Sequence, residues 1–364
     1  MCPRWRCGCP ILSLAKAARR PRMKAIYDPR QRAHNPSQFM AFGVMKPNPE
    51  QPERTEILRS GAEAAGCTFT APEDAGLGPI AALHSPEYLT FLQTIHARWS
   101  EIEGAGPEVI SHIKPGDRRD SYPRSALGQA GYHQADTSCP INADTWGSAY
   151  WSAQTAITAA DLIAKGERAA YALCRPPGHH AFGDMAGGFC FLNNSGIAAQ
   201  LLRDRGLRPA ILDVDVHHGN GTQGLFYDRD DVLTLSIHAD PADFYPFFWG
   251  HSSERGEGRG RGYNLNLPLP RGTEDAPFLD ALDTCLDRVR AFGCDVLVIA
   301  LGLDASVDDP FQGFQVTGDG FSRIGEAIAR AGLPTLFVQE GGYISDSLGH
   351  NLTRVLGGFT SAAR

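Results

Sequence analysis

The feature that most constrains the fold is a set of four short, continuously apolar segments. They are residues 209–216 (PAILDVDV), 232–238 (VLTLSIH), 295–302 (DVLVIALG) and 334–340 (PTLFVQE). A strand with one face in water alternates apolar and polar residues, whereas a strand covered on both faces is apolar almost throughout. Helical segments lie between most of these runs, so the pattern predicts a single-domain, three-layer α/β/α fold with a mostly parallel central sheet.

The size and composition of the chain are those of an ordinary globular protein, with 364 residues of which 42% are hydrophobic and 21% charged. Residues 1–22 are basic, and their apolar run PILSLA is too short for a signal-peptide core or a membrane span. We therefore expect residues 1–22 to be a disordered or non-native extension, and residues 23–364 to form the domain. Two irregular stretches, residues 29–52 and 100–145, predict long loops within it.

Charge and cysteine usage narrow the class of partner. The formal charge is −7, so the chain lacks the basic excess that a phosphate-binding face needs, and nucleic-acid binding is not expected. Beyond the first ten residues the cysteines show no CxxC pairing, which indicates reduced thiols in a cytoplasmic protein. No segment approaches the length of a membrane helix, so no membrane partner is expected either.

Polar clusters follow four of the expected strands at the point where each strand ends. They are RPPGHHA at 175–181, the end of ILDVDVHHGNG at 211–221, GLDAS at 302–306 and EGGY at 340–343. The carboxyl ends of parallel strands are where open α/β sheets place their binding sites. Four such ends that carry His, Asp or Tyr predict one convergent pocket.

Three of these residues suggest a catalytic metal. Asp215 and His217 are two residues apart, so both project to one side of an extended strand end, and Asp304 follows another strand. Two carboxylates and one imidazole leave a coordination position open, which is the pattern of a catalytic rather than a structural zinc site.

The remaining polar residues suit proton transfer. The adjacent imidazoles of His179 and His180 can serve as base and acid, and Asp213 and Asn220 lie in the neighbouring loop, where they can orient these rings. An anionic partner raises the pKa of its histidine more than a neutral one, which would give the two histidines different roles. Tyr343 offers a hydroxyl to stabilise a developing oxyanion.

The motifs RPPGHHA, GGFCFLNN, ILDVDVHHGNGTQ, LGLDA and EGGY occur in the order and spacing of the histone deacetylase superfamily. The resemblance runs from about Met23 to the C-terminus and is strongest to the bacterial acetylpolyamine amidohydrolases. It implies an arginase-like fold and a zinc amidohydrolase that cleaves the amide bond of an N-acylated small amine. The implied roles are zinc ligation by Asp215, His217 and Asp304, hydrogen-bond donation by Tyr343, and general acid–base catalysis by His180 beside His179, with Asp213 behind His179 and Asn220 behind His180.

The same resemblance implies further sites and a homodimer or higher homo-oligomer. A substrate tunnel would be lined by Gly188, Phe189 and Tyr245. A structural potassium ion would be held by Asp213, Asp215, His217, Ser236 and Ile237. A second monovalent cation, potassium or sodium, would lie near Phe226, Arg229, Val232 and Tyr263. The aromatic residues of the long loops, Phe39, Phe42, Trp99 and Tyr122, suit an interface between subunits.

The chain departs from the acetylpolyamine branch where that branch holds the distal ammonium of its substrate. The two acidic positions correspond to Leu127 and Ser138, while nearby acidic residues that could replace them are Glu108, Asp117, Asp120 and Asp136. This departure favours a smaller or neutral amide, including a xenobiotic N-alkyl amide. Protein acetyl-lysine remains an alternative substrate. Two alternative functions are a binuclear manganese ureohydrolase and a non-catalytic binding module, and the sequence does not assign a role to His218.

Overall fold

The central sheet of the computed structural model, which describes residues 22–116, 118 and 121–363, has eight strands in the order β4-β1-β5-β10-β9-β6-β7-β8. Every adjacent pair in it is parallel. The expected extension lies outside the described residues except for Arg22. The strands are β1 (Lys24–Ile26), β4 (Thr68–Thr70), β5 (Ala169–Ala172), β6 (Pro209–Asp213), β7 (Leu233–Ala239), β8 (Asn264–Leu269), β9 (Val296–Leu301) and β10 (Thr335–Gln339).

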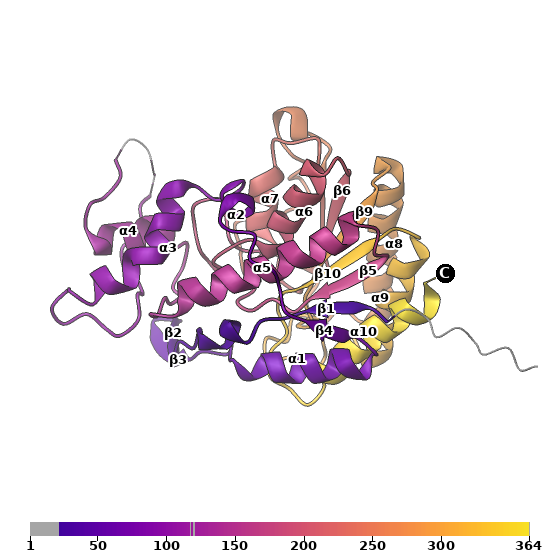
Figure 1. Ribbon diagram of the computed structural model, residues 1–364, viewed down its shortest axis with the longest axis horizontal. Coiled ribbons are helices and arrows are strands. Elements are labelled where there is room, and N and C mark those ends of the chain that lie inside the picture. The colour runs from indigo at the N-terminus through magenta and orange to yellow at the C-terminus, as the bar shows by residue number, and fades with distance from the viewer. Residues whose placement is uncertain (1–21, 117, 119–120, 364) are drawn as a thin grey trace, which may run out of the picture.

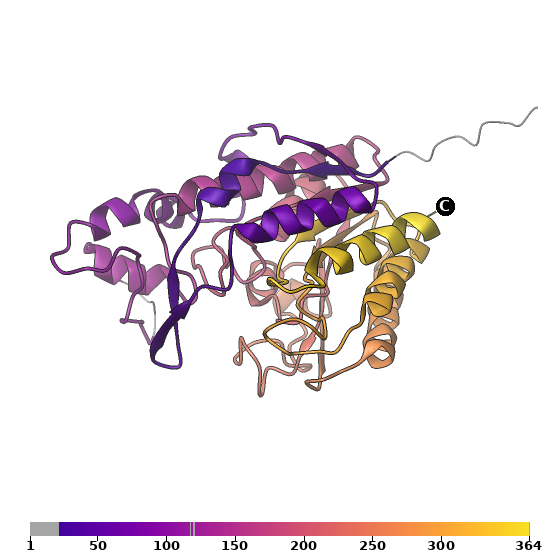
Figure 2. The same cartoon turned by 90° about the horizontal axis from the view of Figure 1, so that it is seen from below.

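Helices cover both faces of this sheet, so the three-layer α/β/α architecture expected from the sequence is confirmed (Figure 1). One face packs against α5 (Thr145–Ala164), α6 (Asn194–Asp204) and α7 (Asn220–Phe226). The other packs against α1 (Glu53–Ala64), α8 (Asp275–Phe292), α9 (Gly318–Arg330) and α10 (Leu348–Ala362), and Figure 2 shows α1 and α10 side by side. No helix among the described residues combines the length and apolarity needed to cross a membrane.

The two long stretches expected as loops contain regular structure. The first holds the 3-10 helix η1 (Pro29–Ala33) and a hairpin of β2 (Gln38–Ala41) and β3 (Val44–Pro47). The second holds α4 (Ala126–His133), which packs with α3 (Pro86–Trp99) in a lobe beside the sheet (Figure 1). The short helix α2 (Gly78–Ala81) and η2 (Gly258–Gly260) complete the described elements. Glycines in α4 weaken its helical signal, yet a Cβ on Gly131 would lie 2.2 Å from the carbonyl oxygen of Ile113, so packing requires glycine there.

The strand order determines where the site forms. β5, β10, β9 and β6 are neighbours, and these are the strands that precede the four polar motifs. Their last residues are in register, because Ala172 pairs with Val338, Val338 with Ala300, and Ala300 with Asp213. All four motifs therefore leave the same edge of the sheet side by side.

Candidate active site

Asp215, His217 and Asp304 form a buried cluster at this edge, with their ligand atoms all within 4.8 Å of one another. His217 Nδ1 lies 3.1 Å from Asp215 Oδ1 and 3.2 Å from Asp304 Oδ2. Two buried carboxylates at this distance repel each other and lose their hydration, so a cation stabilises them. One imidazole and two carboxylates are ligands that zinc accepts in catalytic sites, so these residues fit a zinc ion.

The charges of the cluster depend on one another. Burial disfavours the protonated form of His217, but its contacts with Asp215 and Asp304 outweigh burial and raise its pKa to about 9. Burial and the neighbouring Asp215 charge raise the pKa of Asp304. The cluster therefore retains positive charge on His217 when no metal is bound, and a divalent cation would replace that charge.

The loop that carries Tyr343 packs directly on the carboxylates. Gly341 N–H donates to Asp215 Oδ2 at 2.8 Å, and a Cβ on Gly341 would lie 2.1 Å from Asp304 Oδ2. Gly342 has φ 109°, a conformation that favours glycine. The two glycines of EGGY thus let Tyr343 reach the edge of the sheet.

The two adjacent histidines have different partners and opposite pKa shifts. His179 Nδ1 lies 2.9 Å from Asp213 Oδ2, and His180 Nδ1 lies 2.7 Å from Asn220 Oδ1. Burial disfavours the charged form of His179, but the carboxylates of Asp215 and Asp213 raise its pKa well above the usual value. Burial, His179 and His217 lower the pKa of His180. His180 is therefore neutral and able to accept a proton, beside a positively charged His179.

Tyr343 is buried among aromatic rings. Its ring centroid lies 4.7 Å from that of Phe311 and 5.9 Å from that of Phe189, and its N–H donates to Asp309 Oδ2 at 2.9 Å. Burial and the Asp304 charge raise the pKa of Tyr343 well above its usual value, so the phenol keeps its proton and can donate a hydrogen bond. The sequence pattern did not reveal Phe311 or Asp309, because both lie in an irregular segment between β9 and α9.

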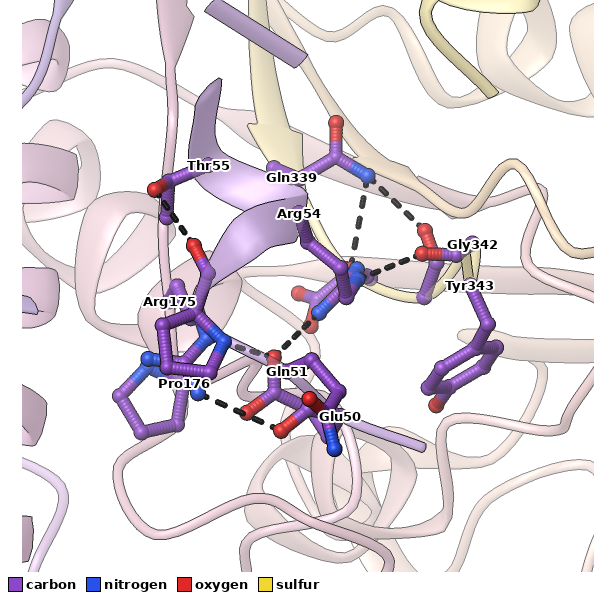
Figure 3. A network of polar contacts seen from close by, with 12 residues as sticks. Glu50, Gln51, Arg54, Thr55, Arg175, Pro176, Gln339, Gly342 and Tyr343 are labelled. Atoms are coloured by element: carbon purple, nitrogen blue, oxygen red, sulfur yellow. Dashed lines mark hydrogen bonds and ion pairs between the residues drawn. The ribbon is translucent and has the colours of Figure 1, made fainter. Parts of the chain in front are cut away.

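Arg54, which the sequence analysis missed, holds the same loop from behind (Figure 3). Its Nε donates to the carbonyl oxygen of Gly342 at 2.6 Å, and its Nη2 donates to that of Glu340 at 2.8 Å. Its Nη1 donates to Glu50 Oε1 at 2.6 Å, and its guanidinium lies 5.1 Å from the centroid of the Tyr343 ring. This fully buried arginine therefore fixes the backbone on either side of Gly341.

Replacing Arg54 with methionine is expected to reduce the free energy of unfolding by about 3–5 kcal/mol and to lower kcat, because a buried Glu50 carboxylate would lose one of its two arginine partners. Arg59→Met is the matched control on the same helix, since its ion pair with Glu63 is about half exposed and is worth about 0.2–1 kcal/mol. Urea denaturation of both variants measures the difference. Equal, small losses would contradict the role given to Arg54.

The residues expected to line a tunnel lie around the two catalytic candidates. The Tyr245 ring centroid is 5.0 Å from that of His180 and perpendicular to it, while Phe189 contacts Tyr343. Gly188 and Phe189 have φ values of 50° and 67°, and a non-glycine residue rarely adopts this conformation. Gly188, Phe189 and Tyr245 are thus brought together by three separate segments of backbone.

The residues named for monovalent cations fall in two places. Asp213 pairs opposite Ser236 across β6 and β7, which brings the first set onto neighbouring strand ends. This set comprises Asp213, Asp215, His217, Ser236 and Ile237. In the second set, the Phe226 carbonyl oxygen accepts from Arg229 N–H at 3.1 Å, and the Tyr263 carbonyl oxygen accepts from Thr234 N–H at 3.0 Å. This second set, Phe226, Arg229, Val232 and Tyr263, surrounds the turn between α7 and β7.

Residues 48–359 match the family model described as "Histone deacetylase domain". The chain belongs to the histone deacetylase family. The family assignment made from the motifs is confirmed, and the matches support an amidohydrolase of the deacetylase type.

Within this family the chain is similar over nearly its whole length to bacterial enzymes. It is 48% identical over 338 residues to the acetylpolyamine amidohydrolase of Burkholderia pseudomallei, covering 93% of this chain and 98% of the relative. It is 45% identical over 347 residues to acetylpolyamine amidohydrolase 1 of Pseudomonas aeruginosa, covering 94% and 100%. The crystal structure of the acetylpolyamine aminohydrolase from Burkholderia pseudomallei superposes with a TM-score of 0.91 at 48% identity, covering 94% of this chain and 100% of the other.

The acidic residues considered as ammonium ligands in this family member are already engaged. Glu108 Oε1 accepts from Ser37 N–H at 2.5 Å, and Asp136 Oδ1 accepts from Ser138 N–H at 2.7 Å. Leu127 is partly buried against the core of the side lobe. Asp117 and Asp120 lie outside the described residues.

The aromatic residues expected at a subunit interface are not equivalent. Trp99 is only 7% exposed and its indole N–H donates to the Gly106 carbonyl oxygen, so the expectation that it lies in an interface is wrong. Phe39 packs on Phe189 within the chain, with ring centroids 5.7 Å apart. Phe42, at the tip of the β2–β3 hairpin, is 94% exposed and is the one of these three that is free to contact a second subunit.

Proposed function

We propose that this protein is a zinc-dependent amidohydrolase that cleaves the amide bond of an N-acylated small amine into a carboxylate and a free amine. The observation that carries the proposal is the convergence of Asp215, His217 and Asp304 with a neutral His180 and a protonated Tyr343. Amide hydrolysis needs an electrophilic centre, a base for water and an acid for the departing nitrogen. This site offers residues for each of these tasks.

The chain's own residues would divide the work as follows. Zinc bound by Asp215, His217 and Asp304 would supply polarisation of the carbonyl and acidification of water. His180 bonds Asn220 through Nδ1, which leaves Nε2 to take the proton of the attacking water and later to protonate the departing nitrogen. The Tyr343 hydroxyl would donate to the carbonyl oxygen as its negative charge develops.

His179 would tune this proton transfer. It lies between Asp213 and Asp215 and holds a positive charge, and its ring centroid is 4.0 Å from that of His180. The adjacent charge keeps the pKa of His180 low, so protonated His180 gives up its proton readily to the amine. The Asp213–His179 pair therefore favours the acid step after water has been deprotonated.

The substrate is expected to be a small amide whose distal end is neutral. This follows from Leu127 and Ser138 at the positions where the acetylpolyamine branch is expected to be acidic, and from the engagement of Glu108 and Asp136 with the protein itself. A distal ammonium therefore finds no free carboxylate among the candidates that the structure describes.

A matched pair of substrates tests this expectation. N-Acetylputrescine ends in an ammonium group, whereas N-pentylacetamide has a methyl group in its place. We expect kcat/KM for N-pentylacetamide to equal or exceed that for N-acetylputrescine, and both reactions to stop when the metal is chelated. A kcat/KM at least tenfold higher for N-acetylputrescine would show that the enzyme selects polyamines, and hydrolysis of acetyl-lysine peptides alone would point to a protein substrate.

A further inference from the structure

Asp136 lies between two walls of the tunnel and contacts both. Tyr245 Oη donates to Asp136 Oδ2 at 2.5 Å, and Gly188 N–H donates to the same oxygen at 3.1 Å. The other oxygen, Oδ1, accepts from Ser138 N–H at 2.7 Å. A single carboxylate thus joins the loop after β7 to the glycine turn that precedes α6.

This junction is next to His180. A Cβ on Gly188 would lie 2.3 Å from His180 Cδ2 and 2.9 Å from Tyr245 Oη, so the three groups are in contact. The ring of Tyr245 also stands perpendicular to that of His180. A shift of either wall would therefore change the space beside the imidazole that transfers the proton.

The segment that carries Asp136 is held on two further sides. Ala135 N–H donates to the Ala186 carbonyl oxygen at 2.7 Å, and Lys114 Nζ donates to the Asp136 carbonyl oxygen at 3.2 Å. Thr137 Oγ1 donates to the carbonyl oxygen of Met40, in the β2–β3 hairpin, at 2.7 Å. Asp136 is therefore part of a fixed frame and not of a freely moving loop.

We propose that Asp136 is a positioning residue, which sets the width of the tunnel by holding Tyr245 and Gly188 and does not bind a cationic end of the substrate. The inference rests on the proposed amide hydrolysis. An ammonium group at Asp136 would compete with Tyr245 Oη and Gly188 N–H for the same oxygen, and would thereby release both walls. The tunnel geometry and cation binding at this residue are thus mutually exclusive.

The test compares Asp136→Asn, Asp136→Ala, Tyr245→Phe and the double variant D136A/Y245F on the same pair of amides, N-acetylputrescine and N-pentylacetamide. Asp136→Asn keeps a carbonyl oxygen for both donors, so kcat/KM should stay within about threefold of wild type on either substrate. Asp136→Ala and Tyr245→Phe should each raise KM about tenfold, by the same factor for both amides. The double variant should be no worse than Asp136→Ala, because both changes break one interaction.

Two results would overturn the inference: a loss in Asp136→Asn that is confined to N-acetylputrescine, or additive losses in the double variant. Glu103→Gln removes an exposed carboxylate from the same excursion and should leave both rates unchanged. If wild-type protein hydrolyses neither amide, the proposed function fails instead. The urea midpoints of the four variants then decide: non-additive losses support the Asp136–Tyr245 junction, and additive losses exclude it.

Discussion

Replacing Tyr343 with phenylalanine is expected to lower kcat by about 10²–10³-fold while KM and metal content change little. Burial and the Asp304 charge raise the pKa of the phenol, so it acts as a neutral hydrogen-bond donor near neutral pH. Phenylalanine keeps the ring that packs on Phe311 and Phe189 and loses only the hydroxyl. The change therefore removes an interaction that strengthens as negative charge develops on the carbonyl oxygen.

Steady-state kinetics together with zinc content per chain measure this effect. Tyr27→Phe is the matched control, because Tyr27 is a buried tyrosine in the core beside Phe69, on the opposite flank of the sheet. An unchanged kcat in Tyr343→Phe, or loss of zinc from that variant, would show that the hydroxyl has another role.

The central strands could be predicted from the sequence because burial on both faces leaves a continuous apolar run. β6, β7, β9 and β10 are buried at every residue. The strands that the sequence analysis missed have weaker patterns: β8 at the edge alternates polar and apolar residues, and β4 at the other edge has only three residues. An edge strand has a neighbour on one side only, so less of its sequence is constrained by burial.

The candidate site could be predicted to the extent that its residues follow strands directly. Asp215, His217, Asp304, His180 and Tyr343 all do so, and parallel pairing then brings them together. Arg54 reaches Gly342 across 288 residues of sequence, and no local pattern indicates such a contact. The role of His218 also needed tertiary structure, which packs its ring 4.5 Å from that of His238.

Asp136 shows a different limit of sequence analysis. Its carboxylate suggested a substitute ligand for an ammonium group, because residue type and proximity in sequence were all that could be compared. The structure adds the donors, and Tyr245 Oη and Gly188 N–H already occupy Asp136 Oδ2. Whether a carboxylate is available to a ligand depends on the hydrogen bonds it already accepts, and these come from segments distant in sequence.

Removing the metal is expected to abolish amide hydrolysis and to lower the stability of the protein. Asp215 and Asp304 are fully buried, so without a divalent cation their mutual repulsion is offset only by His217 and by backbone N–H groups. Zinc that binds only the folded chain stabilises it by about 2.7 kcal/mol when present at 100 times its Kd. The urea midpoint of chelated protein should therefore rise as zinc is added, in parallel with activity.

The stoichiometry of this recovery separates the alternative functions. Among the described residues, a second group of side chains that could hold a metal is His179, Cys190 and Glu340, which has one carboxylate and a thiol whose pKa burial raises well above its usual value. A binuclear manganese site needs carboxylates that bridge two ions, and this group does not provide them. We therefore expect full activity at one zinc per chain. Two manganese ions per active chain would favour a ureohydrolase, and retention of activity after chelation would exclude metal-dependent hydrolysis, because no other group near His180 could activate the carbonyl to a comparable extent.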